Sequence, residues 1–454
     1  MVDPAPRRFG YWPGHLVVVG SMIGAGILTT SGYTLRETGN PVALLGLWAV
    51  GGAIALCGAV TIAELATALP RSGGDYVFVR EAFGRGAGCV SGWATFTLGF
   101  AAPTALIASL AVTYLAAPYA ALLADALPPW AVAELVPLGA SVLILAVGVV
   151  HTLGHRHNAR LQAVTTGLTA GVLLALGVGG IAFGRGDWGH LAAGGWPTPG
   201  QWPALALGLI YVGYSYAGWN AAAYLAGEVR DPARTLPRCL IGGASTVIVL
   251  YLLVNLAYVY ALDPVAMTAR SEDEVKEVAQ LAAEALFGRE AAAVIAAALG
   301  LSLGASVSAY LLTGPRVAFA MAGDGVFPRF AARLHPTRGT PAAATLTQAV
   351  AAVALVWSGS FQKLLDYTSV GLAALSGLTV ASVFPLRRRP GLARPYRLPL
   401  YPLPPVAYLL LTGWTVGYAV YDERSRASAL LGLGTVLLGF PLSKLLAAPD
   451  KAHP

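Results

Sequence analysis

Twelve long apolar runs divide this chain, and they restrict its fold more than any other feature of the sequence. Each run is close to the roughly 20 residues that an α-helix needs to cross the hydrocarbon core of a bilayer. Only 11% of the residues are charged, against roughly a quarter in soluble proteins. We therefore expect an all-α polytopic membrane protein with twelve transmembrane helices. These helices are expected over residues 12–33, 41–68, 86–115, 132–152, 160–184, 202–226, 239–261, 291–320, 341–358, 366–386, 403–421 and 428–446.

The distribution of basic residues predicts how the chain lies in the membrane. When the N-terminus is placed inside and the loops alternate, 21 of the 29 lysines and arginines fall on the inner side. Cytoplasmic loops carry such an excess of positive charge. We expect a multi-pass protein of the cell (inner) membrane, with cytoplasmic ends at residues 1–8 and 447–454. Orientation and contact with the lipid bilayer then explain the net charge of +7, so no nucleic-acid partner is expected.

Two of the apolar runs are interrupted by flexible or polar residues. The first interruption, residues 20–27, contains three glycines within seven residues. Each glycine costs a helix roughly 1 kcal/mol relative to alanine. The second interruption, residues 213–220, lies in the middle of the sixth run. Close helix packing is an alternative explanation, since Gly20-x-x-x-Gly24 also fits the small-residue packing pattern.

The placement of these interruptions predicts an inverted repeat. Each interrupted helix opens a block of five helices, and the two blocks, residues 9–185 and 201–386, are nearly equal in length. Because five is an odd number, the second block must be inverted relative to the first. The broken helices of such transporters meet at the bilayer midplane and form the substrate site. The last two helices, within residues 403–446, fall outside the repeat.

A broken helix can hold both charges of an amino acid with its backbone alone. The N-terminus of its second half presents free N–H groups, which suit a carboxylate. The end of its first half presents free carbonyl groups, which suit an ammonium group. The expected donors are the N–H groups of Ala25, Gly26 and Ile27, and the expected acceptors are the carbonyl groups of Met22, Tyr214 and Ala217. Gly26→Val is therefore expected to abolish transport without unfolding the protein.

Three segments resemble motifs of the amino acid–polyamine–organocation (APC) superfamily. Residues 20–27 resemble its first-helix motif, and residues 64–76 resemble the motif at the end of its second helix. Residues 216–220, followed by residues 227–238, are similar to its sixth helix and the loop that follows. The resemblance covers most of the chain and is strongest to bacterial permeases akin to the L-type amino acid transporters.

This resemblance implies a LeuT-type fold with helices 1 and 6 broken and an extracellular aromatic gate at Tyr214. By analogy with that fold, the pocket would also include Gly218, Asn220, Trp93 and Tyr310. Members that exchange basic substrates carry a glutamate where this chain has Asn220. With no ionised side chain expected near the pocket, a neutral amino acid is the expected substrate.

The coupling ion is left open by the sequence. Several members of the superfamily place a lysine in the fifth helix, in the role of a sodium ion, where this chain has Thr169. Ser306 and Ser308 offer hydroxyl groups to a hard cation, although serines in membrane helices often bond a neighbouring helix. Glu64 is the one carboxylate expected within a span that a coupling proton (H+) could use. An ion pair with Arg71 or the following loop is the structural alternative.

Together these features predict a secondary active transporter, or permease, that works by alternating access as a proton symporter or an amino acid exchanger. Two alternatives share the fold: a non-transporting sensor or binding protein, and an amine or polyamine transporter with acidic residues in its pocket. The sequence holds no motif for hydrolysis or phosphate binding. His151 and His155 have helical metal-ligand spacing, but they stand beside Arg156, whose positive charge would compete with a metal ion. We therefore expect no enzyme activity, cofactor or metal site, and either a monomer or a homodimer.

Overall fold

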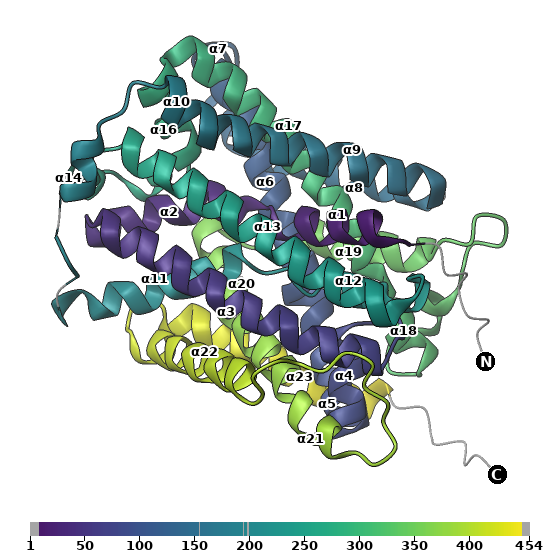
Figure 1. Ribbon diagram of the computed structural model, residues 1–454. Helices are drawn as coiled ribbons and strands as arrows, with labels where there is room; N and C mark the ends of the chain where they lie inside the picture. The colour runs from purple at the N-terminus through teal and green to yellow at the C-terminus, as the bar shows by residue number, and fades with distance from the viewer. Residues whose placement is uncertain (1–8, 154, 194, 198, 447–454) are drawn as a thin grey trace.

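The computed structural model describes residues 9–153, 155–193, 195–197 and 199–446, which form a helical bundle (Figure 1). No strand occurs among these residues, apart from an isolated bridge between Phe9 and Val229. The predicted all-α class is therefore confirmed over the described part of the chain. The predicted cytoplasmic ends, residues 1–8 and 447–454, lie outside it.

The helices follow the order of the apolar runs. The first block contains α1 (Tyr11–Met22), α2 (Ala25–Thr38), α3 (Pro41–Ala68), α4 (Asp75–Phe83), α5 (Arg85–Ala94), α6 (Ala102–Ala116), α7 (Ala120–Ala126), α8 (Pro129–Thr152), α9 (His155–Leu174) and α10 (Gly180–Phe183). The second contains α11 (Trp202–Ser215), α12 (Ala221–Tyr224), α13 (Pro232–Ala261), α14 (Pro264–Met267), α15 (Glu272–Val275), α16 (Val278–Phe287), α17 (Arg289–Thr313), α18 (Pro315–Gly323), α19 (Ala342–Val356), α20 (Phe361–Ala381) and α21 (Val383–Arg388). The helices α22 (Leu403–Tyr421) and α23 (Arg426–Leu446) follow.

Some neighbouring helices continue one another. Single stretches of π-helix at Thr95–Ala101 and Ala175–Gly179 join α5 to α6 and α9 to α10. Within the described residues, nine helical segments are long and apolar enough to cross a membrane, and four shorter helices are apolar. Each of the twelve predicted ranges lies on one helix or on consecutive helices. This agreement follows from the apolar runs, because only internally bonded helices satisfy backbone groups in lipid.

Local signals explain where the second long helix begins. Gly39 ends α2 in the left-handed conformation, at φ +55°. Asn40 then caps α3, since its side-chain oxygen accepts a hydrogen bond from the Ala43 amide at 2.9 Å. Pro41 occupies the first helical position, where a missing N–H costs nothing. The turn between α2 and α3 is therefore specified by three consecutive residues.

Helices that hold the same position in the two blocks pack against each other. The pairs are α2 with α11, α3 with α13, α6 with α17 and α8 with α19. These are the first, second, third and fourth long segments of each block paired with their counterparts. The helices α22 and α23 lie along one side of this core, where they contact α3, α5 and α20 (Figure 1).

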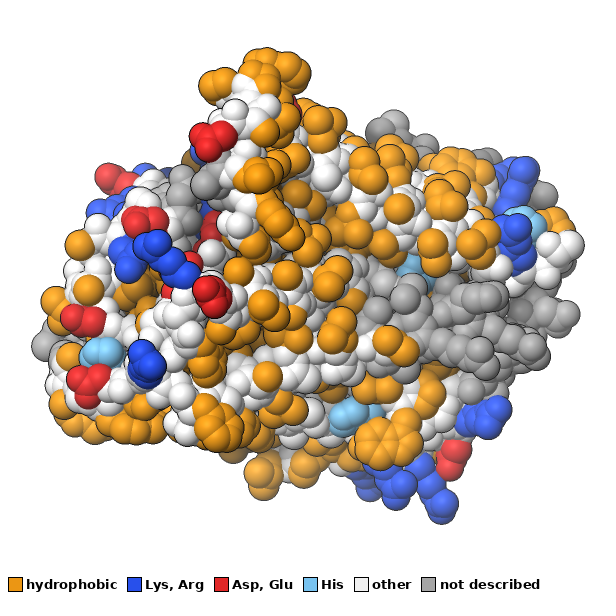
Figure 2. All heavy atoms as spheres, turned by 90° about the horizontal axis from the view of Figure 1, so that it is seen from above, with side chains coloured by type: hydrophobic (Ala, Val, Ile, Leu, Met, Phe, Trp, Pro, Cys, Tyr) orange, Lys and Arg blue, Asp and Glu red, His pale blue; other side chains and the backbone are white. Residues whose placement is uncertain are grey.

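The surface has the charge distribution of a membrane protein. Figure 2 shows hydrophobic side chains across the middle of the molecule, with charged side chains gathered towards its two ends. Val142, Val249 and Leu410 are among the large apolar side chains that are exposed on the surface. We call the end of the bundle that carries Arg80, Arg316 and Arg387 the arginine-rich end.

Candidate functional site

The first predicted break occurs between α1 and α2. The helix α1 ends at Met22, and α2 begins at Ala25 after two residues of extended backbone. Gly24 precedes α2 at φ −145° and provides no side-chain cap. None of the described residues accepts a hydrogen bond from the amides of Ala25, Gly26 and Ile27, and all three residues are buried. A buried helix N-terminus without acceptors is an energetically unsatisfied site.

The second break lies in the sixth predicted span. The helix α11 ends at Ser215, residues 216–220 form a turn, and α12 begins at Ala221. Gly218 has a φ of +101°, which strains any residue with a side chain. A Cβ atom at Gly218 would lie 2.5 Å from the carbonyl oxygen of Ser21 and 3.0 Å from the Met22 amide nitrogen. The two interrupted segments therefore cross with their backbones in contact.

A second contact near the breaks joins α2 to the end of α11. A Cβ atom at Gly26 would collide with the Cα and side chain of Ser215 at the end of α11. The hydroxyl groups of Thr30 and Ser215 are 2.8 Å apart. Gly26→Val would therefore force α2 and α11 apart, so this substitution cannot test carboxylate binding alone, contrary to our expectation from sequence.

The carbonyl groups at the breaks differ in what they already bind. Tyr251 donates its hydroxyl to the Met22 carbonyl at 2.7 Å. The carbonyl of Tyr214 accepts a hydrogen bond from the Ala217 amide at 3.0 Å. No described donor reaches the carbonyl of Ala217. Since a carbonyl oxygen has two lone pairs, all three retain capacity for a ligand, and Ala217 retains the most.

A cavity lies beside the crossing, and we call it the central cavity. It is lined by Ser21, Asp75, Gly99, Phe100, Pro103, Tyr214, Ala217, Gly218, Trp219, Asn220, Ala221, Tyr224, Tyr310, Leu372 and Ser376. Five of the residues singled out from sequence are among them: Tyr214, Ala217, Gly218, Asn220 and Tyr310. Tyr310 also donates its hydroxyl to the Ser21 carbonyl at 2.9 Å. The predicted first-break residues Met22, Ala25, Gly26 and Ile27 are not in this lining. Trp93 is also absent from it and lies near Phe96, with ring centroids 6.3 Å apart.

Asp75 is the ionisable cavity residue that was not expected from the sequence. Its side chain is only 1% exposed, and both of its oxygens accept hydrogen bonds from Asn220 Nδ2, at 2.9 and 3.1 Å. The expectation of a pocket without an ionised side chain therefore overlooked this carboxyl group. The first turn of α4 folds back onto the broken helix, and this brings Asp75 to the cavity although it follows the second span in sequence.

The motif Ser72-Gly73-Gly74-Asp75 shows why the chain can fold back so closely. The Gly73 amide donates to the Tyr224 carbonyl at 3.3 Å. Gly74 has a φ of +53°, and a Cβ atom there would collide with the Tyr224 ring. The paired glycines before an aspartate were the available signal for this approach.

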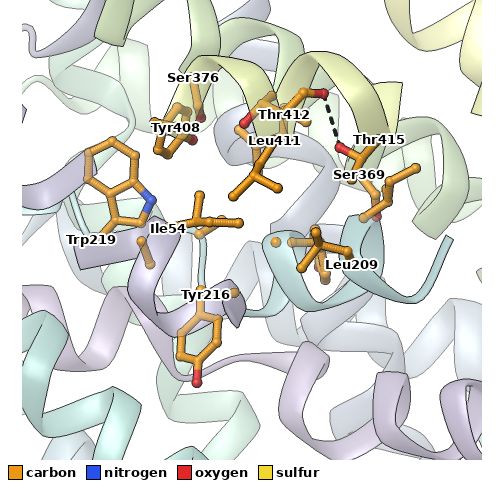
Figure 3. Close-up of a pocket in the computed structure, with 18 residues that line it drawn as sticks. Ile54, Leu209, Tyr216, Trp219, Ser369, Ser376, Tyr408, Leu411, Thr412 and Thr415 are labelled. Atoms are coloured by element: carbon orange, nitrogen blue, oxygen red, sulfur yellow. Dashed lines mark hydrogen bonds between the residues drawn. The ribbon is translucent and has the colours of Figure 1, made fainter. Parts of the chain in front are cut away.

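A second cavity lies behind the sixth-span turn, between α3, α11, α20 and α22 (Figure 3). Trp219, Tyr408 and Ser376 stand together on one side of it, while the hydroxyl of Tyr216 points away and donates to the Trp48 carbonyl at 3.1 Å. Tyr214, Ala217 and Trp219 line both cavities. The interrupted segment 214–219 is therefore the wall between them.

The candidate coupling residues of the fifth and eighth spans fall into two groups. Ser306 donates to the Ile23 carbonyl at the first break, at 3.0 Å. Thr169 is linked to this group through the Ser302 carbonyl, which accepts from Thr169 at 3.1 Å and from Ser306 at 3.3 Å. The hydroxyl of Ser308 instead lies 2.7 Å from His151 Nε2 on α8. Within the described residues, no group of three or more potential metal-binding side chains occurs.

Glu64 lies in a structural ion pair rather than in the central cavity. Its carboxylate accepts hydrogen bonds from Arg387 Nε and from the Leu398 amide, both at 2.7 Å, and Arg394 lies 3.4 Å away. Arg71, which the sequence suggested as a partner, instead pairs with Glu81. The segment after α20 therefore supplies the ligands that hold Glu64 at the arginine-rich end.

Comparisons with known proteins identify the family. The amino acid permease family model matches residues 9–438. The chain is 29% identical over 445 residues to the Asc-type amino acid transporter 1 of Mus musculus, covering 96% of this chain and 80% of that protein. It is 29% identical over 434 residues to the large neutral amino acids transporter small subunit 2 of Homo sapiens, covering 94% and 78%.

A bacterial relative matches along nearly its whole length. The serine/threonine exchanger SteT of Bacillus subtilis (strain 168) is 27% identical over 442 residues, covering 95% of this chain and 96% of that protein. These relatives are transporters and not enzymes. With its apolar helices and two touching helix breaks, the chain is a multi-pass membrane protein that belongs to the amino acid permease family of the APC superfamily.

Proposed function

We propose that this permease moves a neutral amino acid across the cell membrane by alternating access, as proton symport or amino acid exchange. The observation that carries the proposal is the uncapped N-terminus of α2, which is buried against the interrupted sixth-span segment. A buried cluster of N–H donors without acceptors is stabilised when an anionic ligand arrives. The α-carboxylate of an amino acid supplies such a ligand.

In this proposal, the two breaks hold the two ends of the amino acid backbone. The carboxylate lies on the amides of Ala25, Gly26 and Ile27, and the ammonium group faces the carbonyl of Ala217 and those of Met22 and Tyr214. Tyr214 lines the central cavity together with Ala217, and in this proposal its ring is the outer gate. The substrate side chain then enters the part of the cavity that Phe100, Tyr310 and Leu372 line.

The character of the central cavity favours a neutral side chain. Asp75 is its one carboxyl group, and Asn220 already occupies both oxygens. No arginine or lysine lines the cavity, so an acidic side chain would lack a counter-charge. The names of the relatives include a serine/threonine exchanger and a large neutral amino acid transporter, which agree with this class.

The twelve-span LeuT-type arrangement is part of the proposal. Packing of corresponding helices against each other supports two inverted repeats over residues 9–185 and 201–386, because a two-fold axis between repeats brings equivalent elements together. From the positive-inside rule we infer that the arginine-rich end faces the cytoplasm, the side on which the sequence also predicts both termini.

Substrate analogues test the backbone assignments directly. Purified protein is mixed with a labelled neutral amino acid, and unlabelled competitors are added that lack either the carboxylate or the ammonium group. We expect the intact amino acid to compete at least tenfold better than its α-amide or its decarboxylated amine. Equal competition by the amine would refute the carboxylate site and favour amine transport. Tight binding without transport in vesicles would identify a sensor instead.

A further inference from the structure

Asp75 is a buried carboxyl group that connects two parts of the transporter. It begins α4 and lines the central cavity, while its partner Asn220 is the last residue before α12. The bonds from Asn220 Nδ2 therefore join the segment after the second span directly to the broken sixth span. A change at the carboxyl group acts on the helix that must move in an alternating-access cycle.

No described lysine or arginine forms an ion pair with Asp75. The arginines of the adjoining helices have other acceptors: Arg80 binds the Asp324 carboxylate, Arg85 binds the Asp324 carbonyl, and Arg387 binds Glu64. The groups that face the carboxyl are the hydroxyls of Tyr224, Thr379 and Tyr408 and the amide of Asn220. Asp75 thus differs from Glu64, whose negative charge is matched by two arginines.

This environment makes the neutral form of Asp75 accessible at moderate pH. Burial raises the pKa of its carboxyl to about 6, although hydrogen bonds from Tyr224 and Asn220 act in the opposite direction. An aspartate in water, with a pKa of about 3.9, stays ionised near pH 6. The group can therefore take up a proton on the more acidic side of a membrane.

We propose that Asp75 is the site at which this permease binds and releases a coupling proton in each transport cycle. The inference rests on the proposed amino acid transport and selects proton symport among its modes. When ionised, the carboxylate accepts both hydrogen bonds from Asn220 and ties the broken helix to α4. The bound proton converts one oxygen into an O–H donor, so the Asn220 amide loses an acceptor.

The loss of this acceptor supplies the coupling step. With the proton and the amino acid both bound, the contact between Asp75 and Asn220 weakens and α12 can separate from α4. The cavity then opens towards the arginine-rich end, where the proton leaves and the carboxylate binds Asn220 again. A ligand shifts such an equilibrium only through its different affinity for the two states, and here the proton provides that difference.

The test uses the full-length protein in proteoliposomes. Uptake of labelled serine, threonine, alanine or leucine, whichever the wild type exchanges, is measured with and without an inward proton gradient. A trapped pH-sensitive dye reports proton entry. Asp75→Asn removes the titratable group with little change in shape. Glu81→Gln is the matched control, because Glu81 lies on the same helix but pairs with Arg71 and Arg389.

We expect the gradient to raise wild-type and Glu81→Gln uptake at least fivefold, with acidification of the lumen. Asp75→Asn is expected to lose both effects and still exchange external for internal amino acid. Full gradient stimulation in Asp75→Asn would overturn the proposal. Wild-type protein that exchanges amino acids without responding to the gradient would also overturn the proton-site proposal, but the proposed function would remain. If no amino acid is exchanged at all, the proposed function itself is refuted.

Two further measurements test the proposal if Asp75→Asn does not transport or does not fold. If Asp75→Asn is folded but does not transport, substrate binding is compared at pH 5.5 and 7.5. Binding that depends on pH in the wild type alone supports the proton site, and absence of binding at both values assigns Asp75 to the substrate site and overturns it. If Asp75→Asn does not fold, Asp75→Glu replaces it: a shifted pH midpoint of uptake supports the proposal, and an unchanged midpoint contradicts it.

Discussion

The carbonyl oxygen of Ser21 lies so close to Gly218 that a Cβ atom there would be 2.5 Å away. Real Cβ atoms do not approach backbone oxygen this closely. The contact brings together the two interrupted segments, which are almost 200 residues apart in sequence, and it aligns Ser21 and Gly218 on the wall of the central cavity. The substrate site is therefore built by backbone-to-backbone contact.

This contact predicts that Gly218→Ala removes transport. The methyl group would meet the Ser21 carbonyl, and the φ of +101° would add strain of roughly 1–3 kcal/mol. We expect at least a tenfold loss of uptake and a lower melting temperature. Gly213→Ala is the control, because a Cβ atom at Gly213 meets nothing within 4 Å. Equal activity of the two variants would show that transport does not require the close contact between Gly218 and Ser21.

Glu64→Gln is predicted to weaken the fold and spare proton coupling. The substitution leaves Arg387 without its carboxylate partner at a site where Glu64 is 1% exposed. Loss of one member of a buried ion pair costs on the order of 3 kcal/mol. Thermal unfolding in detergent should show the loss, while uptake per folded molecule should keep its response to a proton gradient. Loss of that response would make Glu64 a coupling residue.

The pH dependence of stability provides a prediction for Asp75. Its pKa is raised to about 6 by burial, so the folded state binds more protons than the unfolded state between about pH 4 and 6. Stability contributed by this group is therefore highest at low pH and falls as the pH rises through this window.

Asp75→Asn should consequently raise the melting temperature at pH 7.5 relative to the wild type. The difference between the two proteins should shrink towards pH 4.5, because both side chains are then neutral. Differential scanning fluorimetry at several pH values measures this difference. A difference that does not change with pH would show that Asp75 has an ordinary pKa.

Ser306→Ala and Ser308→Ala should behave differently. Ser306 donates to the Ile23 carbonyl at the first break, whereas Ser308 bonds His151 away from it. Removal of either hydrogen bond costs about 1 kcal/mol of stability. We expect a several-fold loss of transport for Ser306→Ala and near-normal transport for Ser308→Ala, measured as initial uptake rates. The reverse order would contradict the placement of the first break at the substrate site.

Much of the fold could be predicted from the sequence, because lipid permits few backbone conformations. A run such as residues 232–261 must form a helix when every backbone group needs a partner. The breaks could be predicted because glycines such as Gly24 and Gly218 lower the helix propensity in the middle of an apolar run. Local composition thus reports where a membrane helix continues and where it stops.

The site was predicted only in part, since side-chain partners depend on tertiary contacts. Asp75 follows the second span in sequence, and the paired glycines before it signal a close approach without identifying Tyr224 as the partner. The partner of Glu64 lies more than 300 residues away, at Arg387. Gly26 lies in the first turn of a helix, as expected. Its contact with Ser215 could not be predicted, because it depends on how the two breaks lie relative to each other.

Counterflow in proteoliposomes loaded with an unlabelled neutral amino acid is the most direct test of the proposed neutral amino acid transport. Labelled serine, threonine, alanine, leucine, glutamate, lysine and putrescine are offered outside one at a time. We expect uptake of one or more neutral amino acids, little uptake of glutamate or lysine, and none of putrescine, which has no carboxylate. Uptake of putrescine or lysine in preference to every neutral amino acid would contradict it.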